Sequence, residues 1–223
     1  VTGVQTCALP IYKLTFISSE YVFGEAEYHG GVIGPFSEED EPAPSCFYGR
    51  SKLAAEKHIE HIFGKNGALL IRTTMVFSWA PSGNNFLMQY FRHLTDIAEG
   101  KSPALFRIPE DQISTPTYAP ALAEAACELR EKGVTGIVNI VGSDLLSRKE
   151  LVHRVMEEFR FEFRRSLEGF RFLKTAELHQ KARRPLSAGL THRKALDLGV
   201  KILSLKDAFA DIQRIRAKEK AGL

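Results

Sequence analysis

The residues of this chain best suited to chemistry are a phenol, an ammonium and a hydroxyl. Tyr48 and Lys52 lie four positions apart in one predicted helix, so both side chains face the same way. A free phenol titrates near pH ~10, and a nearby ammonium favours its ionised form. Ser19 ends a predicted buried strand, where its hydroxyl can hold a carbonyl oxygen while Tyr48 protonates it. Such a set performs the proton-transfer half of a carbonyl reduction that takes its hydride from a nicotinamide.

The Tyr-x-x-x-Lys spacing is a weak signal by itself, because a chain of 223 residues produces such pairs by chance. Its surroundings strengthen it. A buried strand is predicted over 13–19, a helix from Pro44-Ser45 to Phe63, and a second buried strand over 68–74. Consecutive strands joined by a helix run parallel, and ligands bind α/β sheets at the carboxyl ends of such strands.

The remaining hydrophobic pattern predicts an alternation of helices and strands. Residues 24–45 are rich in Gly, Pro and acids and predict a long loop. Ser147 and Ser204 each begin a capping box and therefore a helix. Further helices are predicted over 86–98 and 117–130, further strands over 104–108, 136–140 and 160–165, and a continuation of the first strand over 21–23.

Composition excludes several classes of function. The net charge of +3 is too small to indicate nucleic acid binding, and no apolar run approaches the ~18 residues of a membrane span. With three cysteines and no export signal, we expect a cytoplasmic protein without a disulfide framework. His58 and His61 lie one turn apart but lack a carboxylate or Cys at ligand spacing, so we expect a solvated helix face and no metal.

The first eleven residues do not fit the strand that comes after them. Residues 1–11 resemble a translated sequencing adapter, and we exclude them from reasoning about the fold as artefactual or disordered. The alternative is a genuine but irregular N-terminal arm.

Five stretches carry a resemblance to a known family. They are Ser18-Ser-Glu-Tyr-Val-Phe23, the acidic-Pro loop 38–42 with Tyr48-Gly-Arg-Ser-Lys-Leu-Ala-Ala-Glu56, Arg72-Thr-Thr-Met-Val-Phe77 with Asn84-Asn-Phe86, Asp111-Gln-Ile-Ser-Thr-Pro-Thr-Tyr118, and Arg183-Arg-Pro-Leu-Ser187. In this order they resemble the dTDP-4-dehydrorhamnose reductase family of the extended short-chain dehydrogenase/reductase superfamily.

The resemblance implies an α/β fold, namely the C-terminal part of a Rossmann-type doubly wound parallel sheet plus a smaller substrate-binding α/β subdomain. It assigns 12–80 and 117–145 to the NAD(P)-binding part, and 81–116 and 146–223 to the substrate-binding part. The cofactor would be NADP or NAD. No Gly-x-x-Gly-x-x-Gly turn precedes a helix in this sequence, so we expect a truncated reductase that binds the dinucleotide weakly or not at all.

The resemblance also implies roles for individual residues. The catalytic set would be Ser19, Tyr48 and Lys52. The cofactor contacts would be Ser18, Tyr48, Lys52, Thr74, Met75 and Val76. The nucleotide-sugar contacts would be Asn84, Asn85, Gln112 and Arg184, the last because a guanidinium suits a diphosphate.

Four departures from the family pattern leave the substrate open. Glu20 replaces the usual Asp, Gly24-Glu25 replaces an Asp-Gly turn, Met75 stands where Trp is common, and Ser114 stands where Gly is usual. The last two fall near the expected nucleotide-sugar pocket.

Reduction of dTDP-4-dehydrorhamnose to dTDP-rhamnose is the function that the resemblance favours. One alternative is a nucleotide-sugar epimerase of the same superfamily. Another is a non-catalytic NADP-binding module, because the regulatory β subunit of methionine adenosyltransferase is similar in the same stretches, including the run at 38–44. The expected partner is a nucleotide sugar, with no nucleic acid and no membrane; a homodimer is left open.

Overall fold

The computed structural model describes residues 14–26, 30–31, 33–161 and 163–221. The predicted adapter segment, residues 1–11, lies outside the described residues. So does Lys13, the first position of the first predicted strand.

A three-stranded parallel sheet forms the centre of the first part of the fold. Its strand order is β1 (Leu14–Ser19), β2 (Ala68–Thr73) and β7 (Gly136–Asn139). In register, Ser19 lies beside Thr73 at the carboxyl ends of β1 and β2. Every residue of β2 is buried, as expected for a parallel strand covered on both faces. The predicted Rossmann-type parallel sheet is therefore confirmed.

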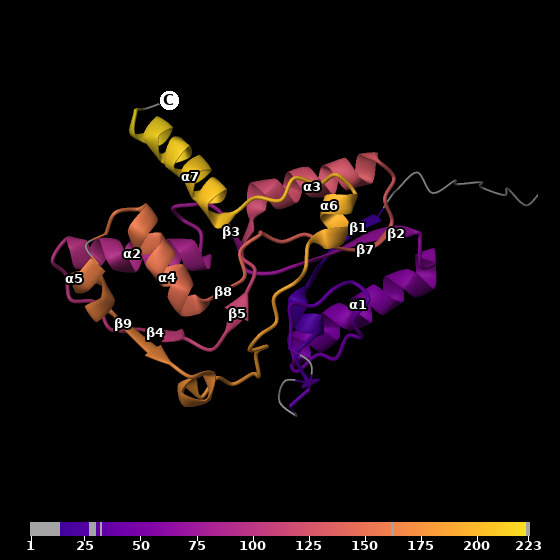
Figure 1. Cartoon of the computed structure of the whole chain (residues 1–223), viewed down its shortest axis with the longest axis horizontal. Coiled ribbons are helices and arrows are strands. Elements are labelled where there is room, and N and C mark those ends of the chain that lie inside the picture. The colour runs from indigo at the N-terminus through magenta and orange to yellow at the C-terminus, as the bar shows by residue number, and fades with distance from the viewer. Residues whose placement is uncertain (1–13, 27–29, 32, 162, 222–223) are drawn as a thin grey trace, which may run out of the picture.

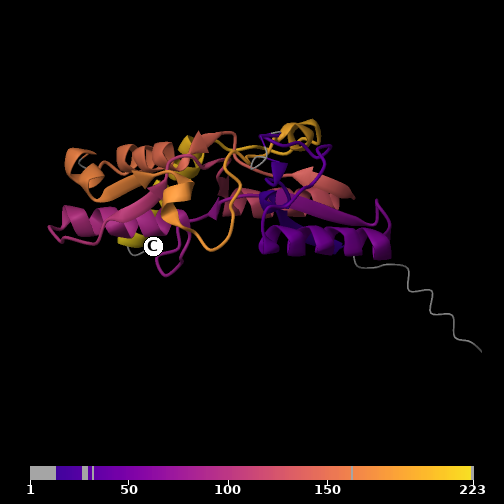
Figure 2. The same ribbon diagram turned by 90° about the horizontal axis from the view of Figure 1, so that it is seen from below.

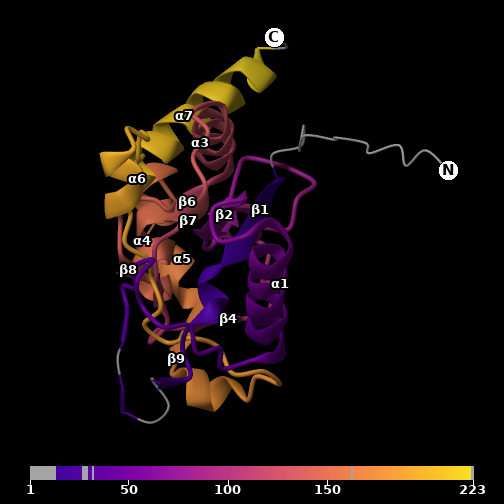
Figure 3. The ribbon, with the colours of Figure 1, turned by 90° about the vertical axis from the view of Figure 1, so that its right-hand side faces the viewer.

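Helices cover both faces of this sheet. The helix α1 (Phe47–Phe63) joins β1 to β2 and lies on one face, whereas α3 (Ala119–Glu131) and α6 (Arg193–Asp197) lie on the other (Figure 3). On the second face, apolar side chains of both helices pack against the sheet; the buried members are Leu69, Ile71, Leu122, Ala125, Leu129, Val138, Ile140, Ala195 and Val200.

A second group of elements gathers at the opposite end of the molecule (Figures 1 and 2). Here β4 (Phe106–Pro109) pairs in parallel with β9 (Phe170–Leu173), beside α2 (Phe86–Ala98), α4 (Arg148–Glu158) and α5 (Phe163–Glu168). The helix α7 (Leu205–Lys220) adds Phe209 and Ile212 to the core of this group. The predicted capping boxes at Ser147 and Ser204 are both present.

Short strands connect the two groups. β3 (Val76–Phe77) pairs in parallel with β6 (Thr117–Tyr118), and β5 (Ile113–Ser114) pairs antiparallel with β8 (Leu146–Ser147). The predicted helix 117–130 therefore begins two residues late, because Thr117 and Tyr118 first pair with β3.

Two predicted strands are wrong. Residues 21–23 do not extend β1, because the Ser19 hydroxyl accepts a hydrogen bond from the Tyr21 amide and starts a 3-10 turn, η1 (Glu20–Val22). Residues 160–165 are not a strand either: Arg160 adopts a φ of 57°, and α5 begins at Phe163. The strand in this region is β9, which begins at Phe170.

The assignment of 12–80 and 117–145 to one part of the fold, and of 81–116 and 146–223 to the other, remains a prediction. Residues 193–197 form α6, which packs on the sheet through Ala195 rather than on the second group. Within the described part of the chain, none of the helices has both the length and the apolar character that crossing a bilayer requires.

Candidate active site

The helix α1 begins where its first turn meets η1. Cys46 caps α1, with its Sγ 3.5 Å from the Gly49 amide that donates to it. Gly49 allows the close approach: a Cβ at this position would collide with the carbonyl oxygen of Tyr21 and lie 2.9 Å from Pro44 Cβ. The first turn of α1 is thereby held against η1, which brings Tyr48 next to the residues that end β1.

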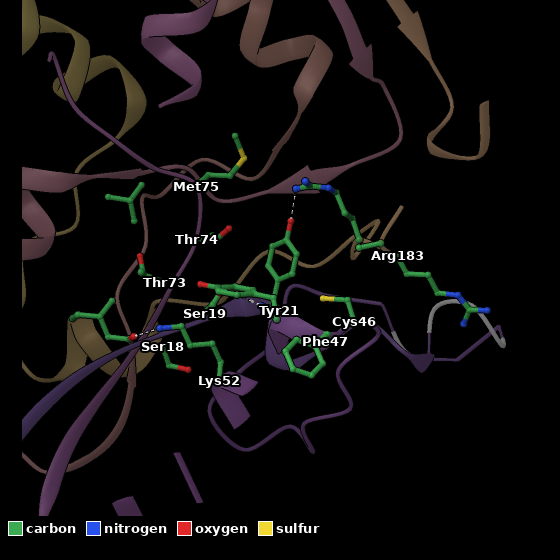
Figure 4. A pocket seen from close by; sticks show the side chains of 15 residues that line it. Ser18, Ser19, Tyr21, Cys46, Phe47, Lys52, Thr73, Thr74, Met75 and Arg183 are labelled. Atoms are coloured by element: carbon green, nitrogen blue, oxygen red, sulfur yellow. Dashed lines mark hydrogen bonds between the residues drawn. The ribbon is translucent and has the colours of Figure 1, made fainter. Parts of the chain in front are cut away.

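Tyr48 and Lys52 face one cavity, as their spacing predicts. Tyr48 is half exposed, and the Lys52 ammonium lies 5.9 Å from the centre of its ring. The ammonium donates a hydrogen bond of 3.0 Å to the Ile17 carbonyl (Figure 4). It also lies 4.9 Å from the centre of the Phe16 ring. Strand β1 thus fixes the position of the lysine charge beside the phenol.

The cavity has a volume of about 530 Å³ and opens at the carboxyl ends of β1 and β2. Its walls come from the end of β1, the start of α1, the segment after β2 and a C-terminal loop (Figure 4). The lining residues are Ile17, Ser18, Ser19, Tyr21, Cys46, Phe47, Tyr48, Lys52, Thr73, Thr74, Met75, Val76, Ala182, Arg183 and Arg184.

Two serine hydroxyls at the end of β1 lie in the wall of the cavity. Ser19 is 8% exposed and accepts from the Tyr21 amide at 3.3 Å, which leaves its own hydrogen for a ligand oxygen. Ser18 is 3% exposed, and its Oγ makes no hydrogen bond with any described residue. A buried polar atom without a partner is costly, so a polar ligand group beside Ser18 would stabilise the site.

The segment after β2 forms the opposite wall. Thr74 is buried, and its hydroxyl lies 2.8 Å from the Ser114 hydroxyl. Met75 has a φ of 43°, a left-handed conformation that is uncommon outside glycine and turns the chain from β2 into β3. The predicted cofactor residues Thr74, Met75 and Val76 all line the cavity together with Tyr48.

The C-terminal loop places Arg184 at the cavity wall, where it contacts Tyr21. Arg184 Nη1 donates to the Tyr21 hydroxyl at 2.8 Å, and the Tyr21 ring meets the Tyr48 ring edge-on. Burial raises the pKa of the Tyr21 phenol, and the positive charge of Arg184 opposes this rise. Arg183 lies alongside, with Nη1 3.5 Å from Glu25 Oε1.

Three predicted substrate residues do not line this cavity. Asn85 caps α2, accepting from the Met88 amide at 3.2 Å and donating to the Ser78 carbonyl at 3.0 Å. Gln112 is buried and donates to the Thr175 hydroxyl at 3.1 Å, and Asn84 is exposed before α2. Their roles as substrate contacts remain predictions.

Sequence reasoning assigned no role to Tyr21, Cys46 or Arg183. Tyr21 lies within the first stretch of the family resemblance, and Arg183 precedes Arg184 in the last, so the resemblance contained a signal for both. Cys46 offered none, because a helix cap and a cavity wall are not visible in the type of a single residue.

Comparisons with known proteins agree with this geometry. The RmlD substrate binding domain family matches residues 4–215. A dTDP-4-dehydrorhamnose reductase of Mycobacterium tuberculosis is 31% identical over 155 residues, covering 69% of this chain and 48% of that protein. The spore coat polysaccharide biosynthesis protein SpsK of Bacillus subtilis is 29% identical over 201 residues, covering 90% of this chain and 64% of that protein.

Among solved structures, a dTDP-4-dehydrorhamnose reductase of Bacillus anthracis in complex with NADP superposes with a TM-score of 0.73 at 22% identity. That match covers 92% of this chain and 66% of the other, and it shows a shared fold. The chain spans about half to two thirds of the length of the relatives described here. The resemblance read from the five sequence stretches is confirmed: the chain belongs to the RmlD substrate binding domain family.

Proposed function

We propose that the natural protein containing this chain reduces the 4-keto group of a nucleotide sugar with NADPH or NADH, converting dTDP-4-dehydrorhamnose to dTDP-rhamnose. One observation carries the proposal. A phenol, an ammonium and a donor hydroxyl (Tyr48, Lys52 and Ser19) line one cavity at the carboxyl ends of two parallel strands. The names of the family relatives point to the same reaction.

The cavity suits a nicotinamide as well as a sugar. Ser18 places in the wall a buried hydroxyl that makes no hydrogen bond within the described part of the chain, and Thr74 adds a second hydroxyl on the opposite side. Ser18, Thr74, Met75 and Val76 would hold the ring, whereas Tyr48 and Lys52 would contact its ribose. The bound nicotinamide supplies the hydride that the carbonyl carbon takes up.

Side chains of the protein would orient the carbonyl group and donate the proton to its oxygen. The Ser19 hydroxyl donates to the ligand carbonyl oxygen and orients it towards Tyr48. Tyr48 gives its hydroxyl proton to that oxygen as the carbonyl carbon becomes tetrahedral, which leaves a phenolate. The Lys52 ammonium, anchored to the Ile17 carbonyl, stabilises the phenolate until it is reprotonated from solvent. Arg184 would bind the diphosphate of the substrate.

A direct assay separates the candidate functions. NADPH oxidation by the natural full-length protein is followed with dTDP-4-dehydrorhamnose, and the product is identified by NMR. Stoichiometric dTDP-rhamnose supports the proposal. Tight NADPH binding without turnover of the keto sugar contradicts it and favours the non-catalytic binding module. A product inverted at another carbon with no net oxidation of NADPH identifies an epimerase.

A further inference from the structure

Two of the departures from the family pattern contact each other. The Ser114 hydroxyl donates to Glu20 Oε2 at 2.9 Å, although the two residues are 94 positions apart. Glu20 is 5% exposed and Ser114 is 4% exposed. In the family pattern these positions are Asp and Gly, so neither partner of this hydrogen bond is the usual residue.

The contact continues to the wall of the cavity. Ser114 Oγ lies 2.8 Å from Thr74 Oγ1, and Thr74 is 4% exposed and lines the cavity beside Ser19 and Tyr48. The three side chains therefore form a buried chain of hydrogen bonds from η1, through β5, to the segment after β2.

The chemistry of the three groups fixes the direction of both bonds. A carboxylate only accepts, whereas a hydroxyl has one hydrogen to donate. Ser114 gives its single hydrogen to Glu20, so it must accept from Thr74. The Thr74 hydrogen is then directed away from the cavity, and only the lone pairs of its oxygen remain for a ligand.

We propose that Glu20 and Ser114 are positioning residues that make Thr74 a hydrogen-bond acceptor in the cavity, so that this wall selects a ligand group bearing an N–H or O–H donor. The inference rests on the proposed function for the identity of that ligand. The amino group of the nicotinamide carboxamide is such a donor, and a sugar hydroxyl is another. A ligand acceptor placed here would face the lone pairs of the buried Thr74 hydroxyl, which is unfavourable.

Matched ligands test the selection in the natural full-length protein. Dissociation constants are measured for NADPH and for its reduced 3-acetylpyridine analogue, which has a methyl group in place of the amino group. We expect the wild type to prefer NADPH about fivefold, the effect of one neutral hydrogen bond. Ser114→Ala frees the Thr74 hydroxyl to turn into the cavity, so the preference should fall to near one.

Three further variants separate this role from a general structural one. Thr74→Val should also lose the preference, because it removes the acceptor. Thr74→Ser should keep it, because the hydroxyl remains. Ser166→Ala removes another buried serine hydroxyl, in α5 and not in the cavity wall, and should leave the preference unchanged. An NADPH preference that survives Ser114→Ala rules out the carboxamide amino group as the donor, and a preference that Ser166→Ala abolishes equally overturns the proposal.

A parallel series identifies the source of the donor. The same variants are titrated with dTDP-rhamnose and with its 2-deoxy and 3-deoxy forms. If only a sugar preference depends on Ser114, the donor is a sugar hydroxyl and the wall acts on substrate. If no ligand preference depends on Ser114, selection at this wall is refuted.

Neutron diffraction provides a readout that needs no ligand. A deuterium between the Thr74 and Ser114 oxygens, and another between Ser114 and Glu20, support the assigned directions. A Thr74 deuterium directed into the cavity overturns them. Correct hydrogen positions in a protein that binds no dinucleotide and no nucleotide sugar would refute the proposed function but leave the hydrogen-bond direction standing.

Discussion

The rings of Tyr21 and Tyr48 meet edge to face at the cavity wall, with their centroids 5.4 Å apart and their planes at 81°. The Tyr21 hydroxyl in turn accepts from Arg184 at 2.8 Å. The C-terminal loop is therefore connected to the proposed proton donor through a single side chain. Aromatic pairs of this geometry contribute about 0.5–1.5 kcal/mol beyond their buried area, which favours this orientation of the half-exposed phenol.

Substitutions at Tyr21 should distinguish the effect of its ring contact with Tyr48 from that of its hydrogen bond with Arg184. Tyr21→Ala removes the ring that supports Tyr48, and we expect kcat for the keto sugar to fall about tenfold. Tyr21→Phe keeps the ring but removes the hydroxyl that accepts from Arg184 Nη1, so kcat should stay within about threefold while KM rises about threefold. Steady-state kinetics of the natural full-length protein measure both constants.

Tyr118→Phe is the matched control for this pair. It removes a phenol hydroxyl that donates to Asp211 at 2.7 Å and does not line the cavity. Its kcat should equal that of the wild type at a temperature where both are folded. An unchanged kcat in Tyr21→Ala would show that the ring contact does not orient Tyr48.

Gly49 should be irreplaceable even by alanine. A Cβ there would collide with the Tyr21 carbonyl oxygen, which is backbone and cannot rotate away. We expect Gly49→Ala to lower the free energy of unfolding by about 2–3 kcal/mol, as overpacking does, and to lower kcat at least tenfold by displacing Tyr48. Urea unfolding and kinetics measure the two effects.

Arg50→Ala is the control for this substitution, since Arg50 is the next residue of α1 and is exposed. Its effect on the free energy of unfolding should stay within about 0.5 kcal/mol. A Gly49→Ala protein as stable and active as Arg50→Ala would refute the close approach of α1 to η1.

The buried ion pair between Arg72 and Glu56 should contribute more to stability than the exposed ion pairs among the described residues. The two side chains are 2% and 3% exposed, with Nη2 and Oε2 2.7 Å apart. Glu56→Gln leaves an uncompensated guanidinium between α1 and β2, so we expect a loss of about 3 kcal/mol in urea unfolding. Glu128→Gln breaks the exposed pair with Lys132 and should cost only about 0.5 kcal/mol. Equal losses in the two variants would contradict this ranking.

The sequence was most informative where local patterns decide the structure. The observed bounds of α2 are those predicted from its hydrophobic spacing, and the capping boxes at Ser147 and Ser204 do begin helices. The i, i+4 rule correctly placed Tyr48 and Lys52 on one face, because helical geometry alone sets that relation.

Contacts between residues far apart in the sequence could not be predicted from local patterns. Nothing local shows that Glu20 would bond to Ser114 or that Arg184 would reach Tyr21, since both contacts close long loops. The alternation of residues 160–165 predicted a strand. This prediction failed because a two-residue period does not show whether a neighbouring strand is available for pairing. The strand that pairs with β4 is β9, a few residues later.

The capping box of α4 should make stability depend on pH. Hydrogen bonds from the Ser147 amide and hydroxyl lower the pKa of the Glu150 carboxyl below its ordinary value of 4.5. A depressed folded-state pKa contributes stability that is present above the unfolded pKa and is lost as the pH falls through the folded pKa. Glu150→Gln should therefore cost about 0.5 kcal/mol at pH 7 and almost nothing near pH 2–3.

Urea unfolding at the two pH values measures this difference. Glu157→Gln, in the last turn of the same helix, is the control and should show no loss at pH 7, because a negative charge there is not favoured by the helix dipole. An equal cost of Glu150→Gln at both pH values would show that the carboxylate charge does not contribute to the cap.

The central claim is that Tyr48 gives the proton to a keto sugar held in this cavity. The measurement that tests it most directly is single-turnover reduction of dTDP-4-dehydrorhamnose by the natural full-length protein and its Tyr48→Phe variant, each saturated with NADPH. The account predicts that the variant binds NADPH and the keto sugar within about threefold of the wild type, while the rate of reduction falls by about 10²–10⁴. A Tyr48→Phe protein that reduces the sugar at the wild-type rate would contradict it.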